Sequence, residues 1–178
     1  MKKTCLALAI TLVLTIFSVS AQAATASGTL TVTATVTGSI NLIFNSDPSG
    51  VTLTGTGTSA ATLAFGSVAA YGGCPAHVTC TPAGINFAVS SPVDVAVYEY
   101  NSSSANYTLK AALGTADATD TWAVGGVTIT TTAATVTSTG AYTTTGTGTN
   151  YPVQITIPYT VANGTNISNT ISYTATAN

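Results

Sequence analysis

The sequence has very few charged side chains. It contains three lysines, no arginine, five carboxylates and one histidine, so that only 4% of its residues are charged. Lys2 and Lys3 stand at the extreme N-terminus, which leaves Lys110 as the only basic side chain in the rest of the chain apart from histidine. Binding to a phosphate backbone needs clustered lysine and arginine. The composition therefore excludes nucleic acid as a partner, and the weak repulsion between copies favours their association.

Long hydrophobic runs are also lacking, with one exception at the N-terminus. Lys2 and Lys3 precede the apolar residues 6–19, and the small residues Ser20-Ala21-Gln22-Ala23 follow. A charged region, an apolar region and a small-residue cleavage site in this order predict a secretory signal peptide over residues 1–23. The run is short for a membrane span and no second one follows, so we expect an exported chain without a membrane span after cleavage.

Cysteine and histidine are too scarce to suggest an enzyme. His77 is the only histidine, and it lies between Cys74 and Cys80. In an exported protein two nearby cysteines most often form a disulfide, and the alternative is a metal site made of Cys74, His77 and Cys80. We expect the disulfide, no metal, no cofactor and no catalysis. A secreted hydrolase that uses His77 or Asp94 is the alternative.

Helical periodicity is almost absent, whereas threonine alternates with apolar residues through much of the chain, a pattern typical of half-exposed strands. Strands are predicted at 29–37, 39–45, 51–56, 61–66, 84–90, 93–100, 106–112, 121–130, 134–139, 151–161 and 167–177. Many short strands separated by turns predict one all-β sandwich, and most are shorter than the ~9 to 11 residues of membrane-barrel strands. The last two are predicted to form a closing hairpin.

Two features of the middle of the chain have structural interpretations. Trp122, together with Val124, Val127 and Ile129, is predicted to lie in the core rather than to stack on a ligand. Asp117 and Asp120 are predicted to form a turn, because the residues around them lack the spacing of a calcium loop.

The most informative stretch is the alternation from Thr29 to Phe44. At ~3.3 Å per residue it would span roughly 50 Å, much longer than the usual strand of a small domain. Gly38 divides it, so we predict an N-terminal arm at 24–38, a hinge at Gly38 and a single domain at 39–178. The arm is predicted to add a strand to a neighbouring molecule through its apolar positions, which are Leu30, Val32, Ala34 and Val36.

Several features together resemble a known family. They are the signal peptide, the threonine-rich arm, the segment "TLAFGSV" at 62–68 with its Phe65-Gly66 pair, and the closing "VQITIPYTVANGTNISNTISYTATAN" at 153–178. This combination resembles the secreted spore-coat-U-type and chaperone-usher-type pilin domains. The resemblance implies an immunoglobulin-like β-sandwich that lacks one strand, which the N-terminal extension of the next subunit supplies. It also implies identical subunits as partners, with a periplasmic chaperone and an outer-membrane usher as further candidates.

The sequence therefore predicts a structural subunit of an extracellular filament on the cell surface. The alternative is a monomeric secreted adhesive or surface-binding module, in which the arm folds back on its own sheet. Three matches to the glycosylation sequon, at Asn106, Asn163 and Asn166, leave glycosylation open.

Overall fold

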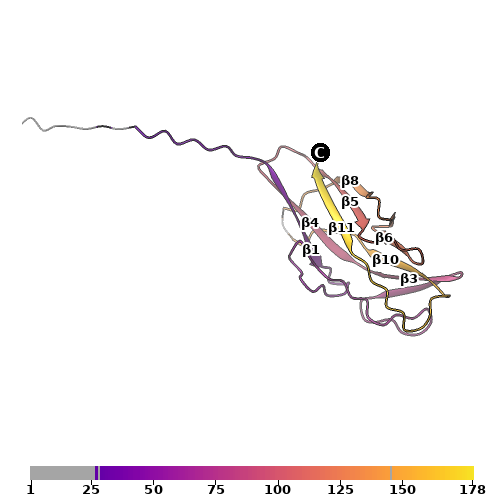
Figure 1. Ribbon diagram of the computed structural model, residues 1–178. Helices are drawn as coiled ribbons and strands as arrows, with labels where there is room; N and C mark the ends of the chain where they lie inside the picture. The colour runs from indigo at the N-terminus through magenta and orange to yellow at the C-terminus, as the bar shows by residue number, and fades with distance from the viewer. Residues whose placement is uncertain (1–26, 28, 145) are drawn as a thin grey trace, which may run out of the picture. The chain divides into compact units, whose positions relative to one another are not determined.

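The computed structural model describes residues 27, 29–144 and 146–178 (Figure 1). The predicted signal peptide, residues 1–23, and residues 24–26 and 28 of the predicted arm lie outside the described residues. The folded unit comprises Val36–Asn178. All regular structure in the described residues is β, which confirms the predicted all-β class. That part of the chain contains no helix able to cross a membrane.

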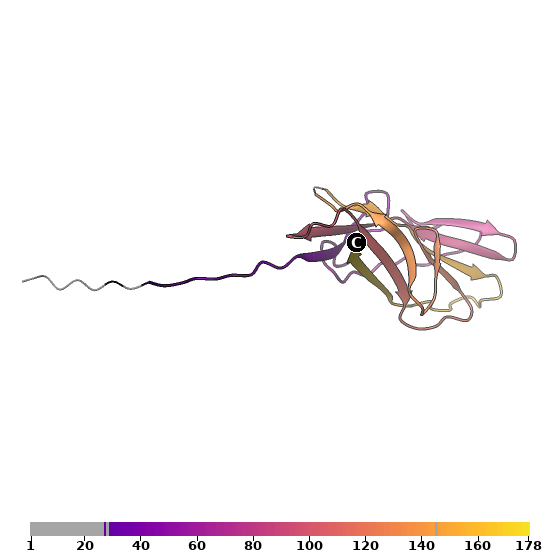
Figure 2. The ribbon, with the colours of Figure 1, turned by 90° about the horizontal axis from the view of Figure 1, so that it is seen from above.

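In the part of the chain that the structure describes, eleven strands form three antiparallel sheets, seen from above in Figure 2. The strands are β1 (Ser39–Ser46), β2 (Thr79–Ala83), β3 (Asn86–Ser91), β4 (Val93–Tyr100), β5 (Tyr107–Leu113), β6 (Thr121–Val124), β7 (Val127–Ile129), β8 (Ala134–Gly140), β9 (Thr149–Asn150), β10 (Val153–Pro158) and β11 (Ile171–Ala177). One sheet has five strands in the order β2-β3-β10-β6-β7, and the two others have three strands each, β1-β4-β9 and β11-β5-β8.

The three sheets share one hydrophobic core. Strands β5 and β10 alternate between buried apolar and more exposed side chains, as expected when one face of a sheet packs inward. Fully or almost fully buried side chains come from every sheet: Val89, Val95, Val97, Leu109, Val124 and Ile155. The arrangement fits a β-sandwich, in which sheets pack face to face over a common core.

Trp122 is part of this core, as predicted, and the turn before it holds its indole in place. Its side chain is 5% exposed. The indole Nε1 donates a hydrogen bond of 2.8 Å to Asp117 Oδ2, while Asp117 Oδ1 accepts from the backbone N–H groups of Thr119 and Asp120. These hydrogen bonds lower the pKa of the Asp117 carboxyl, and the bond from the backbone N–H of Asp120 has the largest effect. Asp117 therefore caps a turn, in agreement with the structural interpretation.

The predicted closing hairpin is wrong. β10 pairs with β3 and β6 in the five-stranded sheet, whereas β11 pairs with β5 in another sheet. The connection of residues 159–170 crosses from one sheet to the other. Alternation showed which side chains face inward, but not which strand lies alongside.

Several other strand predictions need correction. Segments 51–56 and 61–66 form no strand and share only an isolated bridge between Thr54 and Thr62. The predicted strand 121–130 is a hairpin, since Gly125 and Gly126 both have positive φ, 57° and 81°, and form a turn between β6 and β7. The sequence interpretation missed β2 and β9.

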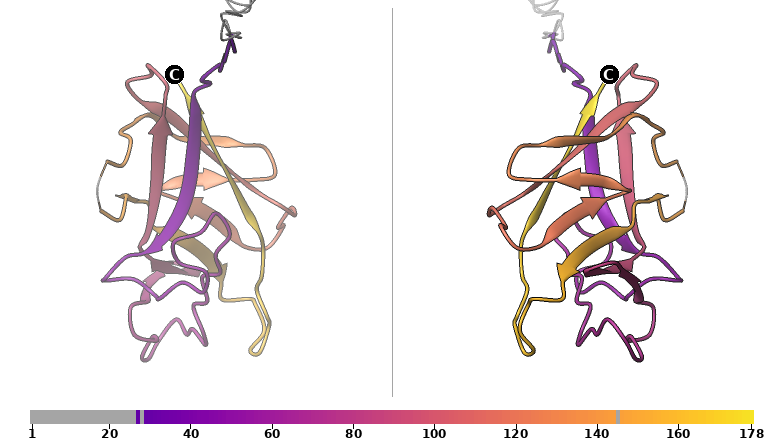
Figure 3. Two further views of the ribbon diagram at one scale, coloured as in Figure 1. Left: turned by 90° about the vertical axis from the view of Figure 1, so that its left-hand side faces the viewer. Right: turned by 90° about the vertical axis from the view of Figure 1, so that its right-hand side faces the viewer.

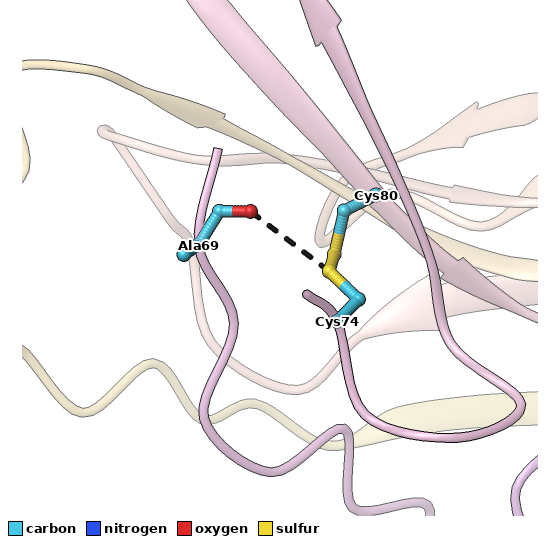
Figure 4. Close-up of a disulfide and its surroundings, with 3 residues drawn as sticks. All are labelled: Ala69, Cys74 and Cys80. Carbon is cyan, nitrogen blue, oxygen red and sulfur yellow. Dashed lines mark hydrogen bonds between the residues drawn. A yellow bond between two sulfur atoms is a disulfide. The ribbon is translucent and has the colours of Figure 1, made fainter. Parts of the chain in front are cut away.

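The two cysteines that the structure describes form the predicted disulfide (Figure 4). The Cα atoms of Cys74 and Cys80 are 6.2 Å apart, within the normal range. The Cys74 sulfur lies 3.8 Å from the carbonyl oxygen of Ala69, which is a contact rather than a hydrogen bond because a disulfide sulfur carries no proton. The pairing removes both thiolates from the alternative metal site with His77.

We expect reduction of this disulfide to have a modest effect. The bond closes a loop of only a few residues, so by the chain-entropy model it contributes about 2 kcal/mol to the free energy of unfolding. Urea unfolding with and without reductant, followed by circular dichroism, measures the difference. Complete loss of β-structure on reduction would contradict this expectation.

Candidate functional site

Strands β1 and β11 are neighbours that do not pair. Figure 3 shows them close together near the C-terminus, running in opposite directions and diverging toward the other end of the domain. Among the described strands, β1 forms a ladder only with β4, and β11 only with β5, so each is the outer strand of its own three-stranded sheet. Two free strand edges therefore face each other.

The backbone of β11 has unused hydrogen-bonding groups along this edge. Gly114 N–H donates to Thr170 O (2.7 Å) and Asn178 N–H donates to Asn106 O (3.1 Å). The backbone N–H and C=O groups of the even-numbered residues of β11 therefore point toward β5. The backbone N–H and C=O groups of the odd-numbered residues of β11 must then point away from β5. Within the part of the chain that the structure describes, no hydrogen bond is found to the backbone groups of these residues, Ile171, Tyr173, Ala175 and Ala177.

The facing edge of β1 is open over its first half only. Phe44 N–H donates to Thr58 O (2.8 Å) and Gly57 N–H donates to Phe44 O (2.7 Å), so a following loop covers the edge at Phe44. Ile40 and Leu42 share the same orientation, and among the described residues their backbone groups on this edge have no partner. Unpaired groups on both walls favour pairing with an additional strand.

The space between the two strands is a groove of about 1400 Å³ whose floor is the hydrophobic core. The buried apolar side chains that line it are Leu53, Val89, Val93, Trp122, Val153, Ile155 and Ile157. A second hollow of about 350 Å³ lies at the mouth of the same gap, between residues 38–40 and 175–177. The larger volume exceeds the ~300 to 1000 Å³ of most small-molecule pockets. Its volume and its strand walls suit an extended peptide.

Segment 59–68 forms one wall of the wider end. The strand prediction covers residues 61–66 of this segment, and the side chains there do alternate: Ala61, Leu63 and Phe65 are half-buried and pack against a small cluster around Leu53. The segment forms no ladder of hydrogen bonds with another strand, because among its described residues only Thr62 forms a backbone bridge, which joins it to Thr54. The segment lines the groove without filling it.

Two aromatic rings meet across the groove. Phe44 from β1 and Tyr173 from β11 have ring centroids 5.0 Å apart in an edge-to-face arrangement. Burial raises the pKa of the Tyr173 hydroxyl. The rings lie between the two strands at this position, whereas Ala175 and Ala177 line only the smaller hollow at the mouth.

The arm residues predicted to bind a neighbour lie outside any strand. Residues 29–38 form no regular structure, and Leu30, Val32 and Val36 are 89%, 81% and 74% exposed. Ala34 is also exposed. The predicted strand 29–37 is therefore absent from this chain as it stands, and its apolar side chains are uncovered.

Gly38 immediately precedes β1 at the mouth of the groove. A Cβ atom there would lie 2.9 Å from Asn101 O, so close packing against the β4–β5 loop favours glycine at this position. The hinge stays a prediction.

The two residues considered for catalysis, His77 and Asp94, each have a polar contact to another group of the domain. His77 Nδ1 lies 3.2 Å from the backbone oxygen of Ser49. Asp94 is 4% exposed, and its Oδ1 lies 3.4 Å from the Asn150 side-chain amide; burial raises the pKa of this carboxyl. Among the described residues, no group of three or more histidine, cysteine or acidic side chains could hold a metal ion.

Sequence reasoning identified one side of this site and missed the other. It singled out the arm, but Phe44, Tyr173 and the free edge of β11 were not predicted as a site. The alternation of Ile171, Tyr173 and Ala175 indicates a strand with one inward face, but the sequence interpretation places this strand in a closing hairpin. The chain matches no protein-family model, and no curated protein and no solved structure is found to be similar to it.

Proposed function

We propose that this chain is a structural subunit of an extracellular filament, in which the arm of one copy inserts into the groove of the next. The observation that carries the proposal is the groove itself, with its two unpaired strand edges and its apolar floor. In this interpretation the domain is an immunoglobulin-like sandwich that lacks one strand. An inserted strand would join the two three-stranded sheets into a single sheet of three plus one plus three strands.

The chemistry of the arm is complementary to that of the groove. Its exposed side chains at even positions are apolar, and threonine stands at the odd positions from Thr29 to Thr37. An arm strand would therefore turn one face to the groove floor and the other to solvent. The disulfide and the predicted signal peptide fit a protein that functions outside the cytoplasm. Assembly by a chaperone and an usher is part of the proposal.

A specific observation keeps one alternative in view. Gly38 lies at the mouth of the groove of its own domain, so the arm could in principle turn back into that groove and give a closed monomer with an adhesive role. Light scattering of the purified full chain separates the two functions. Particles of growing mass support the filament, and a stable monomer supports the adhesive module.

The decisive test removes the arm and supplies it again as a peptide. A chain trimmed to begin at Ser39 should remain monomeric or lose order, and a peptide of residues 27–38 should bind to it and restore order. A peptide in which Leu30 and Val32 are replaced by aspartate is the control and should not bind. Undiminished filament yield from the trimmed chain would overturn the proposal.

A further inference from the structure

The groove between β1 and β11 carries no charge. Among the described residues that line it, none has a charged side chain. The arm is uncharged as well, since residues 29–37 are only threonine, leucine, valine and alanine. A carboxylate that appeared at the edge of this groove would therefore be the first charge there. Covering a carboxylate with an apolar strand is costly, because the charge loses its contact with water.

An asparagine can supply such a carboxylate by reaction with its own backbone. The side chain of asparagine reaches neighbouring backbone groups, among them the nitrogen of the next residue. Glycine as the next residue favours this approach, because it has no Cβ and adopts many backbone conformations. Asn163-Gly164 is the only Asn-Gly pair of the sequence. Both residues line the wide end of the groove.

We propose that Asn163 is a site of spontaneous deamidation, through which the rim of the groove gains a negative charge as the protein ages. The Gly164 nitrogen loses its proton to hydroxide and bonds to Asn163 Cγ. The bond from Cγ to Nδ2 breaks, and the departing nitrogen takes a proton from water and leaves as ammonia. Water then opens the cyclic imide at either carbonyl. The product is aspartate or isoaspartate at position 163, and water is the only co-reactant.

The turn that contains this pair leaves both reacting groups free. Thr165 N–H donates to Ala162 O (3.2 Å), which closes a tight turn with Asn163 and Gly164 at its centre, and Gly164 has a φ of 83°. Both central residues are exposed. Among the described residues, no hydrogen bond is found to the Asn163 side chain or to the Gly164 N–H. A Cβ placed on Gly164 would meet nothing within 4 Å, so water reaches the nitrogen.

Two other asparagines show the opposite arrangement, in which hydrogen bonds hold the reacting groups. Asn150 Nδ2 donates to Asp47 Oδ2 (2.7 Å), and the N–H of the residue after Asn150 donates to Val93 O (2.8 Å). Asn169 Nδ2 donates to Thr115 O (2.8 Å), and the N–H of the residue after Asn169 donates to Asn169 Oδ1 (2.9 Å). In both cases the amide and the following nitrogen are already engaged, so we expect these two residues to remain intact.

The asparagines that are as exposed as Asn163 lack the glycine. Asn101 is followed by serine and Asn166 by the β-branched isoleucine, and both asparagines are exposed. A following residue with a Cβ hinders the approach of the side chain to the nitrogen, and a branched Cβ hinders it more. Asn101 and Asn166 therefore serve as internal references for the rate at Asn163.

The charge would appear where it affects the proposed assembly. An exposed aspartate titrates well below neutral pH, so the new side chain is ionised under ordinary conditions. The part of the inference that concerns assembly rests on the proposed function: a groove with a charged rim accepts the apolar arm less readily. Deamidation would then limit the time during which a free subunit can accept a neighbour.

The chemical step is tested on the full chain by peptide mapping. Samples are held at mildly acidic and mildly alkaline pH for equal times, digested and analysed by mass spectrometry. We expect conversion of Asn163 to aspartate and isoaspartate to be roughly tenfold faster than conversion of Asn101 or Asn166. It should be faster at alkaline pH, because the nitrogen must lose its proton. Conversion of Asn163 no faster than that of the two references would overturn the inference.

Two variants of the full chain test the effect on assembly, measured by light scattering. Asn163→Asp places the carboxylate at once, whereas Asn163→Gln keeps a neutral amide whose larger imide ring forms far more slowly. We expect the aspartate variant to assemble several-fold more slowly than the glutamine variant. Alkaline storage should slow the unmodified chain by a similar factor and leave the glutamine variant at its own initial rate.

The outcomes separate the two proposals. Equal rates for the aspartate and glutamine variants, or an equal loss on storage for the unmodified chain and the glutamine variant, would overturn the effect on assembly. If the fresh unmodified chain does not assemble at all, the proposed function fails, while the peptide map still decides whether Asn163 is the modified residue.

Discussion

Replacing Val32 and Val36 with aspartate is expected to abolish assembly of the full chain and leave a folded monomer. Both side chains are exposed in the isolated chain, 81% and 74%, so the change should not disturb the domain. In the proposed filament each valine contributes about 1.5 to 3 kcal/mol when it is buried. Loss of two such contributions weakens association by roughly 100-fold to 10,000-fold, since about 1.4 kcal/mol corresponds to a factor of ten. The two buried carboxylates weaken it further.

The matched control places the same charges on the other face of the arm. Thr33→Asp and Thr35→Asp lie at odd positions, which would face solvent once the arm is inserted. This variant should still form filaments, as seen by electron microscopy and sedimentation. If both double variants assemble equally well, the alternation of the arm has no part in assembly and the proposed function is wrong.

The second large effect concerns stability. A subunit whose groove is occupied should be much harder to unfold than a subunit with an open groove, because Leu30, Val32 and Val36 of the neighbour become buried. These three side chains together contribute about 5 to 9 kcal/mol. The hydrogen bonds along the free edges of β1 and β11 add to this.

Trp122 provides the measurement, since it is the only tryptophan and lies in the floor of the groove. Its fluorescence during guanidinium unfolding should show a markedly higher midpoint for filaments than for the Val32→Asp/Val36→Asp monomer. Far-ultraviolet circular dichroism checks that the same transition is observed. Equal midpoints for filament and monomer would contradict insertion into the groove.

Local pattern predicted the strands that lie within the core. The predicted 93–100 matches β4, and the predicted 39–45 and 134–139 match β1 and β8 to within one residue. In each of these strands short runs of alternating or β-branched residues end at a turn. Period-two alternation is a property of the strand itself, so it can be found without knowledge of its neighbours.

Pairing and the groove could not be found in the same way. β1 pairs with β4 and β11 pairs with β5, across about fifty to sixty residues of sequence in each case. The strand β2 was missed because it is polar and contains Pro82, which is tolerated because β2 is the edge strand of its sheet. The meeting of Phe44 and Tyr173 arises from this long-range pairing, and nothing in either local sequence indicates it.

The free edge of β11 also has a mechanical consequence. Hydrogen bonds between strands lie across the strand axes, so an arm seated along this edge would be tied to it by bonds perpendicular to its own length. Tension on the filament would pull each arm lengthwise and load these bonds in shear, all at the same time, instead of peeling them apart one after another. Such a joint would resist sudden stretching far better than its modest individual bonds suggest.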